Sequence, residues 1–280
     1  MSPIETLRSF VDAWQCDEND HLNVQFYFGF FEDAAAHFFA LCGLAPIDCP
    51  IPLVRHVRFH SELRGGQLIR IDSHAANAQA PDRWHLVHRL HEPATGRMAA
   101  TALDTFSGAA PVPQVMAVFE EARPRSLAPG PADLPDLLAR KAPVTHRGRL
   151  GTHEIAESGH PFHRALVARF SSAAPHLWES LGAIQPWLAE NRLGRVALEM
   201  KVTTGQTMAP GLVELRSGPM AMGGKTLSFF HVVTAGGSGT LVAGGEVTAL
   251  LFDQTERRAI ALPDEIRSRI ETALAKASEG

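Results

Sequence analysis

Hydrophobic and polar positions alternate along this chain in a pattern that occurs twice. Residues 24–43 are apolar on nearly every side, which predicts a buried helix of about 20 residues, ~30 Å long. A short strand-like stretch precedes it at 11–15. Four segments with alternating apolar and polar residues follow it, as expected for strands, at 52–60, 66–78, 82–92 and 97–109.

The same order returns in the second half of the chain. A second helix is predicted at 162–182, ending at Gly182, which lies 139 residues after Gly43 at the end of the first helix. Four more strand-like segments and a closing amphipathic helix follow, at 195–203, 211–222, 225–235, 240–252 and 263–276. The repeat indicates two copies of one unit.

The repeat defines a fold class and a domain division. We expect an α+β protein made of two tandem units, 1–122 and 146–280, joined by a Pro/Ala-rich linker at 123–145. Each unit is predicted to contain one strand, one long buried helix and a four-strand meander. The simplest way to bury such a helix is to wrap a curved antiparallel sheet around it.

Composition excludes several classes of protein without naming a function. The 280 residues are 45% apolar and 20% charged, with a net charge of −4, so neither nucleic acid nor an anionic membrane is an expected partner. No apolar run reaches the ~18 residues of a membrane span. The N-terminal residues lack a signal-peptide pattern and the three cysteines lack CxxC spacing, so we expect a cytoplasmic protein.

A polar cluster, Asp17 to Asn23, stands at the start of the first long helix. One helix cap requires only one such residue. A calcium loop would need a Gly and a final acid that are missing here. Catalysis accounts for the whole cluster: Asp17 attacks a carbonyl or activates water, the free N–H groups of the helix polarise the carbonyl oxygen, and His21 and Asn23 position substrate or water.

The cluster resembles a known family. Asp17, His21, Asn23 and the aromatic Tyr27 match the D-x-x-x-H-x-N pattern of hot-dog-fold acyl-CoA thioesterases of the 4-hydroxybenzoyl-CoA type, and Asn19 extends the match to plant acyl-ACP thioesterases. The resemblance implies hydrolysis of an acyl-CoA thioester without metal or organic cofactor. It also implies catalytic roles for the four polar residues and substrate contacts from Tyr27 and the first helical turn, Val24 and Gln25.

Active sites of this fold form where two hot-dog units pack side by side, so the resemblance implies an internal pseudo-dimer. The second unit would supply one wall of the first unit's pocket, and further homo-oligomerisation stays open. The 139-residue offset aligns His160 with His21 but Ala156 with Asp17, which predicts an inactive second site. A one-residue gap would bring Glu157 into the place of the acid.

Arg58 has two interpretations. It shares a strand face with His56 and His60, and that face is either solvated or in contact with the phosphates of CoA.

Two other functions remain open for the same fold. Hot-dog hydratases carry D-x-N-P-x-H, with the His five residues after the Asp, whereas His21 follows Asp17 by four. That spacing favours thioester hydrolysis over enoyl-CoA hydration. A hot-dog protein that binds acyl-CoA without catalysis is the third possibility.

Overall fold

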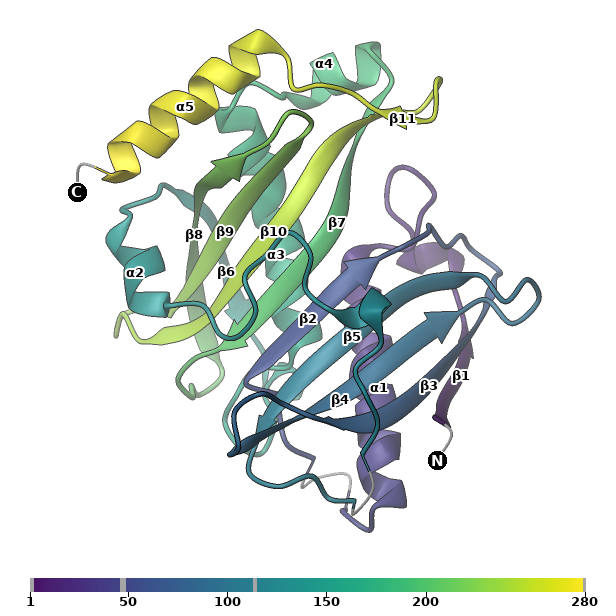
Figure 1. The fold of residues 1–280 in the computed structure, drawn as a ribbon. Coiled ribbons are helices and arrows are strands. Elements are labelled where there is room, and N and C mark those ends of the chain that lie inside the picture. The colour runs from purple at the N-terminus through teal and green to yellow at the C-terminus, as the bar shows by residue number, and fades with distance from the viewer. Residues whose placement is uncertain (1–2, 46–48, 113–114, 279–280) are drawn as a thin grey trace.

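The computed structural model describes residues 3–45, 49–112 and 115–278. Within these residues, 11 strands form one antiparallel sheet in the order β1-β3-β4-β5-β2-β7-β10-β9-β8-β6, with β11 paired to β10 (Figure 1). The first-half strands are β1 Ile4–Phe10, β2 Val54–Phe59, β3 Leu68–Asn77, β4 Arg83–His91 and β5 Met98–Ser107. The second-half strands are β6 Val144–Leu150, β7 Leu193–Thr204, β8 Gly211–Met222, β9 Thr226–Ala235, β10 Leu241–Asp253 and β11 Arg258–Ala259.

The strand order is symmetric about the contact between β2 and β7. These two strands pair antiparallel, from Val54 opposite Thr203 to Arg58 opposite Glu199. Reading outward, β5, β4, β3 and β1 on one side correspond to β10, β9, β8 and β6 on the other. The chain is therefore a tandem hot-dog protein whose two units form an internal pseudo-dimer through one continuous sheet.

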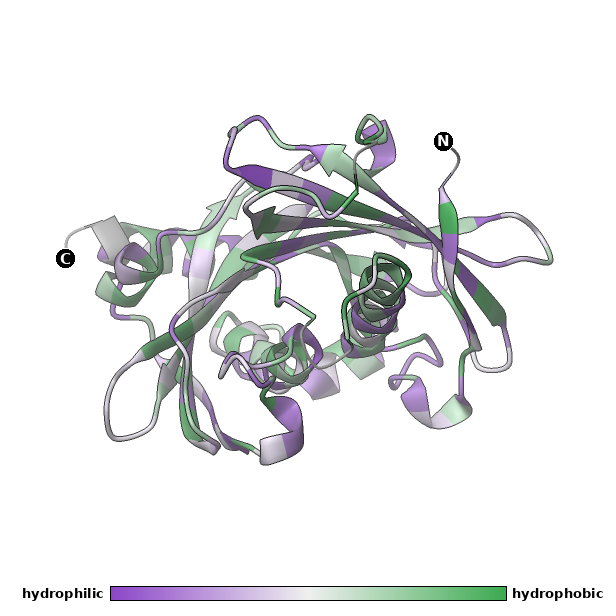
Figure 2. Cartoon of the chain, turned by 90° about the horizontal axis from the view of Figure 1, so that it is seen from below, coloured by the Kyte–Doolittle hydropathy of each residue, from purple (hydrophilic) through white to green (hydrophobic). Residues whose placement is uncertain are grey.

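Two long helices, α1 Val24–Leu41 and α3 His163–Ser180, lie side by side on the concave face of the sheet (Figure 2). Both have 18 residues, and their starts are separated by the predicted 139 residues. Phenylalanines of α1 are almost completely buried against the sheet, namely Phe28, Phe31, Phe38 and Phe39. Because α1 packs against the sheet on one side and against α3 on another, most of its surface is buried, which explains why its sequence is apolar nearly all round.

Two details of the predicted fold need correction. The first strand is β1, Ile4–Phe10, and residues 13–15 form a 3-10 turn instead of a strand. The predicted four-strand meander is wrong, because β2 pairs with β5 and β7 and not with the following strand β3. Between Ser107 at the end of β5 and Val144 at the start of β6, the chain forms a long connection that contains most of the predicted linker.

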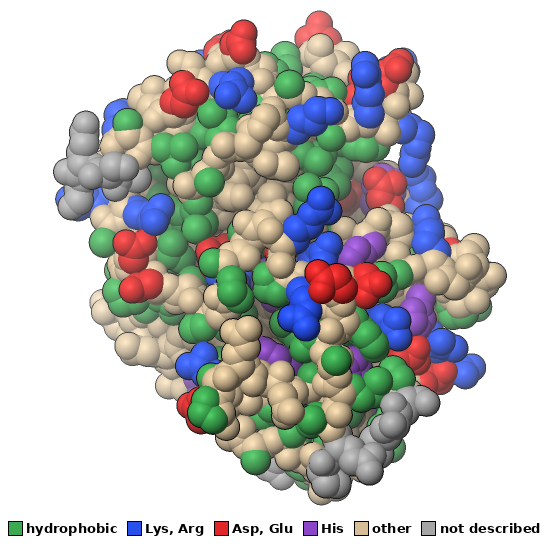
Figure 3. All heavy atoms as spheres, in the orientation of Figure 1, with side chains coloured by type: hydrophobic (Ala, Val, Ile, Leu, Met, Phe, Trp, Pro, Cys, Tyr) green, Lys and Arg blue, Asp and Glu red, His purple; other side chains and the backbone are tan. Residues whose placement is uncertain are grey.

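That connection crosses the convex face of the sheet and carries a 3-10 turn, η3 Glu120–Ala122, and the short helix α2 Leu134–Ala139 (Figure 1). Two further helices, α4 Gln185–Glu190 and α5 Asp264–Ser278, belong to the second unit. On the convex face, acidic and basic side chains are interspersed (Figure 3). Among the helices in the described part of the chain, none has the length and apolarity needed to cross a membrane.

Candidate active site

The polar cluster folds into a compact loop that leads into α1. A 3-10 turn, η1 Ala13–Gln15, comes first. The backbone N–H of Asp17 then donates to His21 O at 2.8 Å, and the N–H of Asn23 donates to Gln15 O at 3.0 Å. Asp20 sits at the tip with φ of 59°, a left-handed conformation that Asp tolerates better than most residues. The loop thus holds Asp17 beside the first turn of the helix.

The Asp17 carboxylate is half-buried and anchored on one side. Its Oδ1 accepts the backbone N–H groups of Asn19 at 2.8 Å and His21 at 3.2 Å. Its Oδ2 has no protein partner among the residues that the structure describes. Burial raises the pKa of Asp17 above the ordinary aspartate value, although the two backbone hydrogen bonds oppose that shift. The group is an oriented carboxylate with one oxygen left for chemistry.

The start of α1 provides an unused hydrogen-bond donor. Asn23 is the N-cap, and its Oδ1 accepts the N–H of Gln25 at 3.1 Å. The N–H of Phe26 donates to Asn23 O at 3.0 Å. Within the described residues, the N–H of Val24 has no acceptor. This amide is therefore available to a substrate oxygen at the positive end of the helix dipole.

The remaining predicted residues of the cluster lie at the same mouth. The His21 ring has Nε2 3.0 Å from Arg64 Nη2 and 3.2 Å from Glu62 Oε2, so only its backbone contacts the Asp17 carboxylate. Asn19 Oδ1 accepts a hydrogen bond from Gln254 of the second unit. Tyr27 is buried, with its ring edge-on to Phe59.

A cavity of about 750 Å³ opens in front of this loop. Asp17, Asn19, His21, Val24 and Tyr27 line it from the first unit. Its opposite wall comes from the second unit, residues 194–198 of β7 together with Phe252, Gln254 and Arg257. From the sequence we expect residues 199–204 or 229–231 of the second unit near this mouth. Met200, Phe229 and His231 line a smaller pocket behind it together with Asp17, whereas Thr204 lies toward the other mouth, bonded to Pro52 O.

A smaller pocket of about 170 Å³ continues from the mouth beneath α3. It shares Asp17, Glu18, Val24 and residues 195–197 with the larger cavity. The rest of its lining is mainly apolar and comes from the second unit: Phe170, Ala174, Pro175, Trp178, Met200, Phe229, Val247 and Ala249. Asp17 and the free Val24 amide thus stand where a polar mouth meets an apolar pocket.

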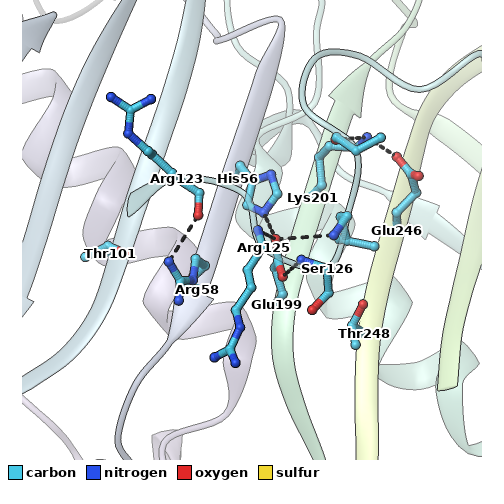
Figure 4. A network of polar contacts seen from close by, with 12 residues as sticks. His56, Arg58, Thr101, Arg123, Arg125, Ser126, Glu199, Lys201, Glu246 and Thr248 are labelled. Atoms are coloured by element: carbon cyan, nitrogen blue, oxygen red, sulfur yellow. Dashed lines mark hydrogen bonds and ion pairs between the residues drawn. The ribbon is translucent and has the colours of Figure 1, made fainter. Parts of the chain in front are cut away.

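Two predicted substrate contacts, Gln25 and Arg58, are not brought to this cavity. Gln25 lines the cavity at the opposite mouth. The Arg58 side chain lies on the convex face, where Nη1 donates to the carbonyls of Glu120 at 3.2 Å and Arg123 at 3.1 Å (Figure 4). The face is therefore covered by the connection between the units and is not a solvated surface.

The opposite mouth has the same backbone hydrogen bonds, but it lacks the counterparts of the Asp17 carboxylate and the Asn23 cap. The N–H of Ala156 donates to His160 O at 2.9 Å, as Asp17 does to His21, and Phe162 takes the place of the Asn23 cap. The N–H groups of His163 and Arg164, the first turn of α3, bind the Glu32 carboxylate of α1. Glu32 thereby occupies the anion site that is open at Val24 in the first mouth.

Sequence analysis missed the cationic rim of the first mouth. Its members come from four separate segments that only the fold brings together: Arg64, Arg97, Arg195 and Arg257. Arg64 and Arg257 have side chains that are 49% and 68% exposed, so they can meet an anionic ligand. Arg64 and Arg97 stand next to predicted turns, at Gly65–Gly66 and Thr95–Gly96, but the sequence offers no comparable signal for Arg195 and Arg257.

The chain is similar to known proteins both in sequence, over part of its length, and in structure, over most of it. Residues 11–110 match the Thioesterase-like superfamily, and a comparison with curated proteins finds no match. The 12:0-ACP thioesterase of Umbellularia californica has a similar structure, with a TM-score of 0.58, 9% identity, and coverage of 88% of this chain and 93% of that one. An acyl-ACP thioesterase of Bacteroides thetaiotaomicron is also similar, with a TM-score of 0.58, 10% identity, and coverage of 87% of this chain and 96% of that one.

A protein from Lactobacillus plantarum described as an oleoyl thioesterase gives a TM-score of 0.60 at 9% identity, covering 94% of this chain and 98% of that one. At such identities the structural similarity shows the fold and not the substrate. The long match in fold agrees with two hot-dog units in one chain. Residues 11–110 are therefore similar to the Thioesterase-like superfamily, within a chain that has the tandem hot-dog fold.

Proposed function

We propose that this protein hydrolyses an acyl-CoA thioester to free acid and CoA at the first mouth. The observation that carries the proposal is the placement of the Asp17 carboxylate and the unused Val24 N–H together, at the junction between a polar cavity and an apolar pocket. The acyl group fits the apolar pocket, and the pantetheine arm leaves through the mouth.

The chemistry follows from these two groups. Asp17 either removes a proton from water, whose oxygen then attacks the thioester carbon, or attacks that carbon itself to form a mixed anhydride that water hydrolyses. In both routes the carbonyl oxygen gains negative charge, which the Val24 N–H stabilises at the helix N-terminus. The C–S bond then breaks, and the thiolate of CoA leaves and takes up a proton.

The arginine rim supports CoA as the carrier of the acyl group. Guanidinium groups suit phosphates because they present several donors in one plane. Arg64 and Arg257 are exposed at the rim. Arg257 lies 3.9 Å from Glu62, and Arg64 lies 3.5 Å from Asp20 and 3.0 Å from His21 Nε2. Arg195 lies deeper, 3.7 Å from Glu18.

Acyl carrier protein is the second candidate carrier, because two of the full-length structural matches are acyl-ACP thioesterases. Both carriers present the same phosphopantetheine arm. Release of free thiol from matched acyl-CoA and acyl-ACP substrates, followed with a thiol reagent, tests the activity and ranks the carriers.

We expect thiol release with a higher kcat/KM for acyl-CoA. Thiol release from neither carrier would reject hydrolysis. The hydratase alternative is tested in the same samples with an enoyl-CoA, where loss of the conjugated double bond without thiol release would favour it. Tight binding of acyl-CoA with neither reaction would favour the non-catalytic binding protein.

A further inference from the structure

The apolar pocket is lined by two polar side chains that have a buried atom without a hydrogen-bond partner among the described residues, Ser171 on α3 and His231 on β9. His231 on β9 is 1% exposed and lines the pocket. Its Nδ1 lies 2.6 Å from Ser217 Oγ, which is 2.6 Å from Thr145 Oγ1. Its Nε2 has no hydrogen-bond partner among the described residues. Buried polar atoms are usually satisfied, so this one requires an explanation.

The first unit contains the same Thr–Ser–His series of side chains, but the contact of the histidine Nε2 differs. His88 corresponds to His231, with Nδ1 2.6 Å from Ser73 Oγ and Ser73 Oγ 2.6 Å from Thr6 Oγ1. There, however, the other ring nitrogen, Nε2, faces a carboxylate: it lies 3.5 Å from Asp104 Oδ2, which is within ion-pair distance although outside hydrogen-bond geometry. Asp104 in turn accepts two hydrogen bonds from Arg55.

The buried charges of the first unit trace a continuous path. Arg55 Nη1 lies 3.9 Å from Glu32 Oε1, and Glu32 accepts the Arg164 N–H at 3.0 Å. A line of ionisable side chains thus runs from the start of α3 to His88, and Glu32 and Arg55 in that line also border a separate cavity of about 660 Å³ at the second mouth. Among the described residues of the second unit there is no such path, although the two halves of the sheet have matching strand pairings.

The register shows what replaced those charges. Arg55 pairs with Asp104 across β2 and β5, and Met200 pairs with Val247 at the matching place across β7 and β10. Ser171, 139 residues after Glu32, takes the place of that acid, and its Oγ is buried without a partner. The shorter uncharged side chains leave the pocket beneath α3 open, from the Val24 N–H at the mouth to His231.

We propose that this pocket selects a short acyl group that carries a hydroxyl or carbonyl oxygen at its far end, bound by His231 Nε2. The inference rests on the proposed hydrolysis at the first mouth. The acyl carbonyl lies at the Val24 N–H, the chain passes Met200 and Val247, and the distal oxygen replaces the partner that Asp104 provides to His88.

Size and charge narrow the class of acyl group further. A cavity of about 150 Å³ in other proteins holds one benzene ring, so the pocket of about 170 Å³ suits a single ring or a chain of similar volume. Burial lowers the pKa of His231 to about 3, so the ring is neutral. A neutral imidazole does not compensate a buried carboxylate, so the distal group is expected to be uncharged.

The test compares hexanoyl-CoA with hexanoyl-CoA derivatives hydroxylated at carbon 4, 5 or 6, and with dodecanoyl-CoA. For wild-type protein we expect at least one hydroxylated thioester to exceed hexanoyl-CoA by roughly tenfold in kcat/KM, the equivalent of one satisfied buried hydrogen bond. Dodecanoyl-CoA is expected to be the poorest substrate. In His231→Phe the ratio should fall to about one.

His88→Phe is the matched control, because it changes the equivalent ring in the first unit, where Arg55 and Asp104 stand in place of Met200 and Val247. This variant should keep the wild-type ratio. Calorimetric affinities of Asp17→Asn protein for the same thioesters give a second measure that does not require turnover. Thiol release without any preference for a hydroxylated thioester, or a best rate with dodecanoyl-CoA, would overturn this inference and leave hydrolysis intact.

The converse result separates the two proposals. A preference in affinity without thiol release would reject hydrolysis and retain the selectivity of the pocket. If His231→Phe does not fold, the wild-type ratio and the Asp17→Asn affinities still decide the question. Equal affinity for all four hexanoyl thioesters rejects the inference.

Discussion

Asp17 combines the properties of a catalytic carboxylate. Backbone amides orient one oxygen while burial raises its pKa, and the free helix amide lies at the same junction. Because a nucleophile or general base must be deprotonated, kcat/KM should fall as pH decreases through the pKa of Asp17. We expect the midpoint above the ordinary aspartate value of about 4. A pH–rate profile measured where the fold is intact checks this, and a midpoint below 4 would contradict it.

His21 is expected to have a smaller effect than Asp17. Its ring contacts Arg64 and Glu62 at the rim, and only its backbone reaches the carboxylate. His21→Ala should therefore lower kcat/KM by roughly tenfold, the cost of one positioning interaction. Steady-state kinetics of the variant provide the measurement. A loss as large as that of an Asp17 variant would assign His21 to bond-making and revive a shared Asp/His activation of water.

Some residues of the site can be predicted from the sequence alone, and others cannot. Asp17, His21 and Asn23 were predictable because they are contiguous and precede a helix whose amides need partners. His231 was not, because its significance depends on the absence of Asp104's counterpart, which only the strand register reveals. Arg58 was misplaced, because strand alternation indicates which residues share a face but not what covers that face.

Among the elements, β7 holds the connection between the units with a buried carboxylate, alongside the bonds that Arg58, Lys201 and Thr203 make to the same connection. Glu199 of β7 accepts the N–H groups of Arg125 at 2.9 Å and Ser126 at 2.7 Å, and lies 2.5 Å from His56 Nε2 (Figure 4). Burial by itself would raise the pKa of Glu199, but these hydrogen bonds outweigh it and hold the pKa at about 2. The contact therefore depends on an ionised carboxylate.

Glu199→Gln should release the connection. Losing the charge weakens hydrogen bonds worth ~1.5–3 kcal/mol each, so we expect a clear fall in Tm and faster proteolysis between β5 and β6. Because the folded pKa lies below the unfolded value, this stabilisation should also disappear as pH falls from about 4.5 to 2. Glu214→Gln, which changes a partly exposed pair with Arg147, is the control. Equal Tm and proteolysis in both variants would refute the role.

Arg58→Ala separates the convex face from the site. Its guanidinium bonds to carbonyls of the same connection and not to the cavity. We expect KM for acyl-CoA to stay unchanged while Tm falls modestly. A several-fold rise in KM with unchanged kcat would instead return Arg58 to a role in uniform substrate binding.

At the scale of the whole molecule, the two units are expected to be inseparable. The β2–β7 pairing joins the half-sheets, and β7 supplies the wall opposite Asp17. Residues 1–122 expressed alone should aggregate, because β2 becomes an uncovered edge with Val57 at its centre. Size-exclusion chromatography of the fragment is the measurement. A soluble, monomeric fragment with thiol-releasing activity would contradict a site built by both units.

The tandem order was predictable at this scale because helices and strands recur at a constant offset. The position of β2 was not, since its partners β5 and β7 are distant in sequence and local alternation does not encode them. Ala156 in the sequence already indicates that the second mouth lacks the counterpart of Asp17. The way Glu32 occupies its helix amides could be seen only in the structure.

Thiol release by Asp17→Asn and Glu157→Gln proteins distinguishes a chain with one working site, in the first mouth, from a chain with two. Each variant replaces one carboxylate by its amide, and each residue lines one of the two mouths. We predict that Asp17→Asn lowers kcat by ~10²–10⁴ with an unchanged Tm, while Glu157→Gln stays within about twofold of wild type. Substantial activity in Asp17→Asn protein, or loss of half the turnover in Glu157→Gln protein, would contradict a single working site in the first mouth.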